Sequence, residues 1–169
     1  MSRSTVFLAL SALLLLSPRT QAQDKAATAT ACLPSATLDQ LPAALDDAIS
    51  GPGDKDRTCL RNLMIPEVRL VLVVGEERRV LTLDDWINAM NKRGGTVLFE
   101  RQVKVKCETF GRIAHLWNTY EIRPTADGKA TTRGINSIQA VFDGQSWRLL
   151  AVLWQAEGPS VPIPEKYLP

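Results

Sequence analysis

The chain of 169 residues carries 20 Lys and Arg against 18 Asp and Glu, and 45% of its residues are apolar. This length and apolar content suit one domain with a real core, and they are a poor match to a disordered protein or a coiled coil. Removal of Arg3 and Arg19 with an expected leader leaves 18 basic against 18 acidic residues. A neutral mature chain without a basic stretch longer than two residues gives no reason to expect a nucleic-acid partner.

Residues 1–22 have the three parts of a secretory signal peptide. Arg3 precedes an apolar run from Val6 to Leu16, and small residues at Thr20 and Ala22 precede the expected cleavage site. The run is too short to span a membrane as a helix, which needs about 20 apolar residues. We therefore expect export to the periplasm or the cell exterior, with no membrane attachment after the signal is removed.

Residues 23–36 are small and polar without periodicity, and they predict a flexible tether. The mature chain contains Cys32, Cys59 and Cys107, and export exposes them to oxidation, so one disulfide and one free thiol are expected. Three pairings are possible. Cys32 with Cys59 is preferred, because it ties the N-terminal segment to a nearby helix and leaves Cys107 as a buried strand residue. Lipidation of Cys32 is a minor alternative.

Two helices are predicted first. Leucine and isoleucine at helical spacing predict a helix over 38–49, which the Gly-Pro-Gly at 51–53 ends. A second, short helix follows, capped by Asp54 or Asp56 and ended by Pro66.

The next elements are a strand over 68–74, from its β-branched apolar run, and a third helix. Thr82 and Asp85 form a variant capping box for this helix, and Gly94-Gly95 end it. Its inner stripe is expected to be Trp86, Ile87 and Met90.

From Thr96 onward the pattern changes to long strands, at about 96–108, 112–123, 130–142 and 146–156. Helices followed by a meander predict an α+β domain over 37–157, with N-terminal helices packed on one face of a strongly curved antiparallel sheet. Residues 158–169 contain four prolines in twelve residues and predict an extended surface tail.

Two Asp-Gly pairs, at 127–128 and 143–144, are typical of two-residue type I′ turns. Such turns place opposite each other the residues whose numbers sum to 255 in the first hairpin and 287 in the second. One sheet face then carries large aromatic and aliphatic side chains with a few polar ones, which is typical of a ligand pocket. The other face is semi-polar and carries residue types that are favoured at dimer contacts. A slip of one residue in the first hairpin would instead bring Asn118 and Tyr120 inward. The predicted pocket face includes His115, Trp117, Thr119, Glu121, Asn136 and Trp147; the predicted dimer face includes Tyr120, Arg133 and Trp154.

The order of helices, then LTLDDWINAM, the hairpin around FGRIAHLWNTYEIR, and RGINSIQAVFDGQSWRLLAVLWQAE resembles the nuclear transport factor 2-like superfamily, in particular its SnoaL-like branch. The resemblance covers residues 38–157. It implies a cone-shaped α+β fold around a pocket, frequent dimerisation through the sheet and no common cofactor. Members include proton-transfer isomerases, dehydratases and cyclases, and also binding proteins without catalysis, so the fold alone does not choose the activity.

His115 is the only histidine and is the candidate general acid or base, with Glu121 as a second acid. A Cys107–His115 nucleophile pair is a weaker alternative, because no third residue is identified to orient the base. The resemblance implies that steroid isomerases of the superfamily use an Asp as base and a Tyr as hydrogen-bond donor. This pattern is not matched, because the predicted strands 112–123 and 146–156 carry no Asp on either face. The ligand-binding candidates are Trp117, Thr119, Asn136 and Trp147.

Three functions follow from these residues. The first is an exported domain that binds a small apolar or carbonyl-bearing molecule, the second is a proton-transfer enzyme that uses His115, and the third is a homodimeric interaction module. No metal or cofactor is expected. The sequence contains no HExxH, GxSxG or Walker motif, and a single histidine excludes multi-histidine zinc sites.

Overall fold

A computed structural model describes residues 31–169, so the predicted signal peptide and residues 23–30 of the predicted tether lie outside the described residues. Residues 31–36 have no regular secondary structure. They are held in place by the Cys32–Cys59 disulfide, which confirms the preferred pairing, and by the Trp147 N–H, which donates to the Ser35 carbonyl at 2.7 Å. Within the described range, no helix combines the length and the apolar character that membrane crossing requires.

The helices lie where the sequence places them. A 3₁₀ turn, η1 (Leu38–Gln40), leads into α1 (Leu41–Ile49), and α2 (Thr58–Leu63) and α3 (Leu83–Asn91) follow. The predicted capping box of α3 is present, because the Thr82 hydroxyl accepts from the Asp85 N–H at 3.1 Å and the Asp85 carboxylate accepts from the Thr82 N–H at 3.0 Å. The N-cap of α2 is Arg57, so neither Asp54 nor Asp56 holds the predicted capping position; Asp56, one residue before the N-cap, accepts the N–H of Thr58 at 2.9 Å.

Seven strands form one sheet in the order β1-β4-β5-β6-β7-β2-β3. Their bounds are β1 (Gly51–Pro52), β2 (Met64–Val74), β3 (Glu77–Leu81), β4 (Val97–Phe110), β5 (Ile113–Arg123), β6 (Thr132–Phe142) and β7 (Trp147–Ala156). The sheet is mixed, because β2 runs parallel to β7, so the purely antiparallel prediction is wrong. Pro66 lies inside β2 and does not end α2. The short β1 and the charged β3 were not predicted.

The predicted register is also wrong. An eight-residue loop joins β5 to β6 and a four-residue loop joins β6 to β7, so neither Asp-Gly pair forms a two-residue turn. Partners in the first hairpin sum to 254, with Asn118 opposite Asn136 and Tyr120 opposite Gly134. In the second hairpin Phe142 lies opposite Trp147, and the pairing shifts between Gln139 and Ala140. The slip of one residue in the first hairpin exchanges the two faces of β5.

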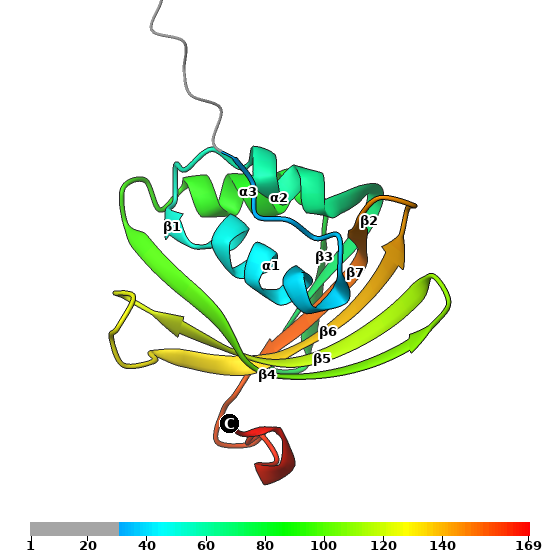
Figure 1. Cartoon of the computed structure of the whole chain (residues 1–169). Helices are drawn as coiled ribbons and strands as arrows, with labels where there is room; N and C mark the ends of the chain where they lie inside the picture. The colour runs from blue at the N-terminus through cyan, green and yellow to red at the C-terminus, as the bar shows by residue number, and fades with distance from the viewer. Residues whose placement is uncertain (1–30) are drawn as a thin grey trace, which may run out of the picture. The chain divides into compact units, whose positions relative to one another are not determined.

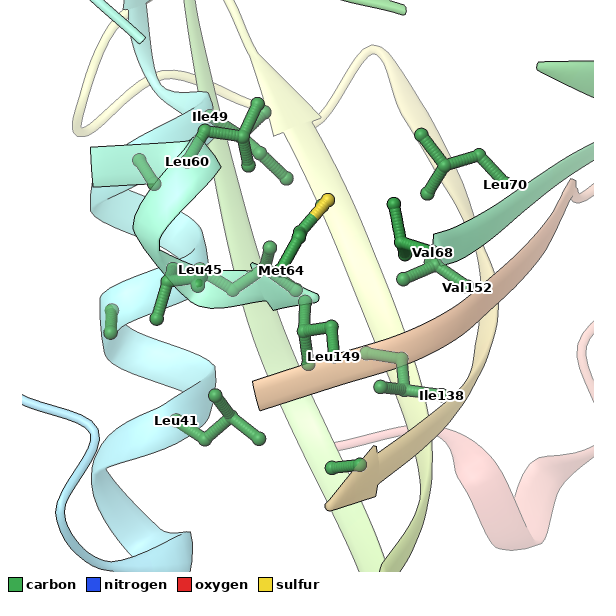
Figure 2. Close-up of a cluster of buried hydrophobic side chains, with 14 of the residues drawn as sticks. Leu41, Leu45, Ile49, Leu60, Met64, Val68, Leu70, Ile138, Leu149 and Val152 are labelled. Carbon is green, nitrogen blue, oxygen red and sulfur yellow. The ribbon is translucent and has the colours of Figure 1, made fainter. Parts of the chain in front are cut away.

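The helices cover the concave face of the curved sheet, and the C-terminal segment lies against the opposite, outer face (Figure 1). The core lies between the helices and the sheet. Figure 2 shows the α1 side chains Leu41, Leu45 and Ile49 gathered with Met64 and Leu149, all of them 5% exposed or less. This packing fixes α1 against the sheet and so positions every group that α1 presents to β4.

We call residues 158–169 the C-terminal strap. It has an isolated bridge between Gly158 and Val161 and a 3₁₀ turn, η2 (Glu165–Tyr167). Its last residues are held through main-chain carbonyls: the Thr119 hydroxyl donates to the Tyr167 carbonyl and the Lys104 ammonium donates to the Leu168 carbonyl, both at 2.5 Å. The strap therefore covers part of the outer sheet face.

Candidate functional site

A cavity of about 310 Å³ lies between α1, α3 and the concave sheet face. Most of its wall is apolar, and the rings of Trp86 and Trp154 form part of it with centroids 5.7 Å apart. The polar or charged side chains in the wall are Arg93, Glu100, Tyr120 and Asn136. An apolar cavity with a few convergent polar groups is the usual form of a small-molecule site.

Glu100 is the acid of this inner cavity, and the Gln102 side chain links it to a second acid. The Gln102 amide nitrogen donates to Glu100 Oε1 and to Asp46 Oδ1, each at 3.1 Å. The Gln102 side-chain oxygen accepts from the Asn136 amide at 3.2 Å. The four side chains form one hydrogen-bonded network that holds the two carboxyl groups near each other.

Both carboxyl groups have raised pKa values. Burial raises the pKa of Glu100 to about 7; the charge of Asp46 adds to this shift, and hydrogen bonds from Gln102 and Asn136 oppose it. Burial raises the pKa of Asp46 to about 6, against hydrogen bonds from the Gln102 main chain and side chain. At neutral pH Glu100 therefore exchanges readily between its acid and carboxylate forms.

The two acids have different positions. Glu100 lines the inner cavity, whereas Asp46 lines a separate surface depression beside the start of α1. Asp46 also accepts the main-chain N–H of Gln102, at 3.0 and 3.1 Å, and the Ser50 hydroxyl accepts the main-chain N–H of Glu100 at 2.9 Å. The short strand β1 pairs with β4 only at Val97 and Leu98. Beyond this point, side chains of α1 and of its C-cap residue Ser50 accept the main-chain N–H groups at the edge of β4.

A β-bulge lies next to this network. The pairing of β4 with β5 shifts between Gln102 and Lys104. Bulges bend a strand and re-aim its side chains, and they are frequent beside functional sites. Here the strand reaches the bulge with Glu100 and Gln102 on the inner face.

Tyr120 lies on the same face, opposite Gly134. A Cβ atom at Gly134 would stand 2.5 Å from the Tyr120 hydroxyl oxygen, so the absent side chain leaves room for the phenol. Burial raises the pKa of Tyr120 to about 12, with the charge of Glu100 as a second cause, so the phenol stays protonated. Within residues 31–169 its hydroxyl has no hydrogen-bond partner, which leaves it available to a ligand.

Most of the predicted site residues lie elsewhere. His115 is on the outer face, with Nε2 3.1 Å from the Ser137 hydroxyl and its ring against Trp117. Thr119, beside them, holds the strap. Of the predicted set, only Asn136 lines the inner cavity. The structure therefore does not bring the predicted site together, although the catalytic role proposed for His115 stays a prediction.

The other predicted groups are also separated from the inner cavity. Glu121 forms an ion pair with Arg123 at 2.5 Å, and Trp147 packs against Phe142 at the far end of the hairpin. Cys107 is exposed and not buried, and it lies opposite Leu116 on the face that His115 does not share, so the Cys-His pair is not formed.

The predicted dimer face is also corrected, by the slip in the first hairpin for Tyr120 and by the shift between Gln139 and Ala140 in the second hairpin for Trp154. Tyr120 is 4% exposed beneath the helices, and Trp154 packs against Trp86 inside. Arg133 lies on the outer face and pairs with Glu157 at 2.9 Å. A homodimer stays a prediction, but Tyr120 and Trp154 do not supply its surface.

A second cavity, of about 450 Å³, lies between the outer face and the strap and includes Trp117, Ser137 and Tyr167 in its wall. Its acid, Glu157, is already paired with Arg133 and accepts the N–H of Ile163. We take the smaller inner cavity as the candidate site, because it holds an acid without an ion-pair partner among the described residues.

The sequence contains one signal for Glu100 that was missed. Leu98 and Glu100 have the same parity in a strand, so a charged residue follows an apolar one on the face that packs against the helices. A charge at an inward position of a half-buried strand is a feature of functional sites.

Comparison with known proteins supports the fold. No protein-family model matches the sequence, and no curated protein matches it. A nuclear transport factor 2-like protein of unknown function from Silicibacter pomeroyi has a TM-score of 0.53 at 19% identity, covering 71% of this chain and 92% of that chain. The chain has the nuclear transport factor 2-like fold.

Two further solved structures have this architecture. A protein of unknown function with a cystatin-like fold from Nostoc punctiforme has a TM-score of 0.58 at 12% identity, covering 74% of this chain and 91% of that chain. A protein named as a "putative ketosteroid isomerase" from Parabacteroides distasonis has a TM-score of 0.50 at 12% identity, covering 76% of this chain and 98% of that chain. At these sequence identities the similarity shows the fold alone, so the activity has to be inferred from the residues of the site.

Proposed function

We propose that the inner cavity binds a small, largely apolar molecule with a carbonyl group, and that Glu100 transfers a proton on it. One observation carries this proposal: Glu100 is the acid in the cavity wall, and no cation pairs with it within the described residues. An acid used for structure alone is normally paired or solvated. The name "putative ketosteroid isomerase" that one solved structure of this fold carries is compatible with this reaction class.

The proposed step begins with the Glu100 carboxylate. It accepts a proton from the carbon next to the ligand carbonyl, and the C–H electron pair forms a C=C bond while the carbonyl oxygen becomes an enolate. The Tyr120 hydroxyl donates a hydrogen bond to this oxygen and stabilises its charge. Glu100 then returns the proton to the same carbon or to a conjugated one, so the reaction consumes no other reactant.

Asp46 acts in this proposal as a positioning residue. Its carboxylate fixes the Gln102 main chain and side chain, and its negative charge raises the pKa of Glu100. When the pKa of a base lies near the working pH, a large fraction of the base is deprotonated and ready to accept a proton, and its proton affinity is still high enough to drive the transfer.

The proposal is tested with 2-tetralone, a flat apolar ketone with acidic hydrogens next to its carbonyl. The protein should accelerate exchange of these hydrogens in D₂O, followed by NMR, with a rate that rises with pH and levels above about 7. Glu100→Gln should lose about a hundredfold or more of this acceleration, and Tyr120→Phe about tenfold or more.

The control is Glu108→Gln, which removes an exposed carboxylate from the same strand and should exchange at the wild-type rate. Exchange by folded Glu100→Gln at the wild-type rate, or wild-type exchange no faster than in buffer, would contradict the proposal.

We also propose that the mature protein is exported. The Cys32–Cys59 disulfide supports this location, because disulfides persist in oxidising compartments. The intact mass of the protein from its own cells tests it: the mass should correspond to a chain that begins at Gln23, and a chain that retains Met1 would contradict the proposal.

A further inference from the structure

Arg93 is a cation in the wall of the inner cavity that the proposed proton transfer does not use. It follows α3, and its side-chain atom Nη1 is buried without a hydrogen-bond partner in residues 31–169. Its guanidinium also forms no ion pair within this range. The residue as a whole is half-buried, but a buried N–H donor of a charged group is expensive to leave without an acceptor, so this nitrogen at a cavity wall indicates a missing anionic acceptor.

A second guanidinium lies near it and adds to the positive charge. Arg57 is 3% exposed and donates to the carbonyls of Ala48, Ile49 and Pro52 at 2.8 to 2.9 Å. Burial lowers the pKa of Arg57, and the charge of Arg93 lowers it further. Neutral carbonyls balance Arg57 only in part, and no carboxylate pairs with either arginine in the described part of the chain.

The acid and the cation of the cavity do not form an ion pair within residues 31–169. Glu100 Oε1 instead accepts from the Gln102 side-chain amide at 3.1 Å. Glu100 is therefore not the partner of Arg93. A ligand that binds both residues of the inner cavity needs an anionic group at Arg93 and a different group at Glu100.

The main chain around Arg93 is fixed before any ligand binds. The Arg93 N–H donates to Met90 at 3.0 Å, and the Asp54 N–H donates to Gly94 at 3.2 Å. A Cβ atom at Gly53 would stand 2.8 Å from the Arg93 Cβ, so the glycine lets this loop pack against the stem of the arginine. A fixed main chain and stem reduce the conformational freedom that the side chain loses when it binds an anion.

We propose that the ligand of the inner cavity is a carboxylate: a small apolar molecule whose carboxylate group is bound by Arg93 while its carbonyl-bearing end faces Glu100 and Tyr120. This inference rests on the proposed function, because it places the ligand in the same cavity. The guanidinium fork matches a planar carboxylate through two parallel hydrogen bonds, a match that a neutral amide cannot make.

The test compares 2-naphthoate with 2-naphthamide, which have the same apolar body and differ in charge. Binding is measured by calorimetry at pH 6, where Glu100 is largely protonated and does not repel the naphthoate. The wild type should bind the carboxylate about 10- to 100-fold more tightly than the amide, the range expected for hydrogen bonds to a charged group. Arg93→Met should bring this ratio close to one.

Two further variants make the result specific. Lys92→Met removes the exposed cation next in sequence and should keep the wild-type ratio. Arg93→Lys keeps the charge without the fork and should retain part of the preference; it also tests the inference if Arg93→Met fails to fold, as judged by circular dichroism. A preference that persists in folded Arg93→Met, or is lost equally in Lys92→Met, would overturn the inference.

The outcomes separate the two proposals. Binding of the amide without preference for the carboxylate, together with tetralone exchange that depends on Glu100, would overturn the carboxylate inference and leave the proposed function standing. Failure of the wild type to bind either naphthalene, with no tetralone exchange, would overturn both.

Discussion

Replacing Glu100 by Gln should make the protein more stable at neutral and higher pH. Burial and the charge of Asp46 raise the pKa of Glu100 from 4.5 to about 7, which means that the fold favours the protonated acid. This favourable contribution is fully present below pH 4.5 and is lost as pH rises through about 7. At about 1.36 kcal/mol per pH unit, the loss amounts to about 3 kcal/mol in the free energy of unfolding.

Glutamine has nearly the shape of the protonated acid and does not ionise, so the variant escapes this loss. Its stability relative to the wild type should differ little at pH 4.5 and should increase to about 3 kcal/mol near pH 8. Urea unfolding followed by tryptophan fluorescence at several pH values measures this difference as a change in the midpoint at constant slope. Glu108→Gln, which removes an exposed charge from the same strand, corrects for the change in net charge.

The result that would refute the reasoning is a stability difference that stays constant between pH 4.5 and 8, or one that grows toward acid. Either would show that Glu100 is not held preferentially in its protonated form, and that the cavity does not shift its titration to neutral pH.

Three other predictions follow. Asp46→Asn should lower the pKa of Glu100, because it removes the negative charge that raises it, so the pH midpoint of tetralone exchange should move toward acid; an unchanged midpoint would contradict the coupling. Gly134→Ala should cost about 1–3 kcal/mol in urea unfolding, because its Cβ would stand 2.2 Å from a β7 carbonyl oxygen, whereas Gly158→Ala, with no atom within 4 Å, should cost much less. Reduction of the Cys32–Cys59 disulfide, which spans 27 residues, should lower the free energy of unfolding by about 3–4 kcal/mol, measured with and without reductant; no change would show that the crosslink constrains little.

The elements that depend on local sequence were predictable. The apolar spacing of α1 and the capping box of α3 depend on residues three or four positions apart, and both are present in the structure. The parallel pairing of β2 with β7 joins segments about 80 residues apart, and no local pattern encodes it. The strand β3 is rich in charged residues because it is a sheet edge, so its composition did not predict a strand.

The site was harder to predict than the fold for a related reason. Strand side chains alternate between faces, so one residue of error in the β5 register moved His115, Trp117 and Thr119 from the inner face to the outer one. That error came from treating Asp127-Gly128 as a two-residue turn, when the pair is part of a longer loop. The acid network depends on Asp46 and Glu100, which lie on a helix and a strand that were not expected to share hydrogen bonds.

The anchoring of the C-terminal strap has a consequence for how the end of the chain can vary. Its last contacts use the carbonyls of Tyr167 and Leu168, which every residue type provides. Substitutions at these two positions preserve the anchors to Thr119 and Lys104, whereas a deletion or insertion upstream moves both carbonyls away from their donors. These two anchors fix the length of the strap, and the Tyr167 ring adds side-chain contacts with Trp117 at 5.8 Å and with the Lys106 ammonium at 5.2 Å. Trimming the terminus by a few residues would remove both kinds of contact and uncover part of the outer face of the sheet without touching its strands.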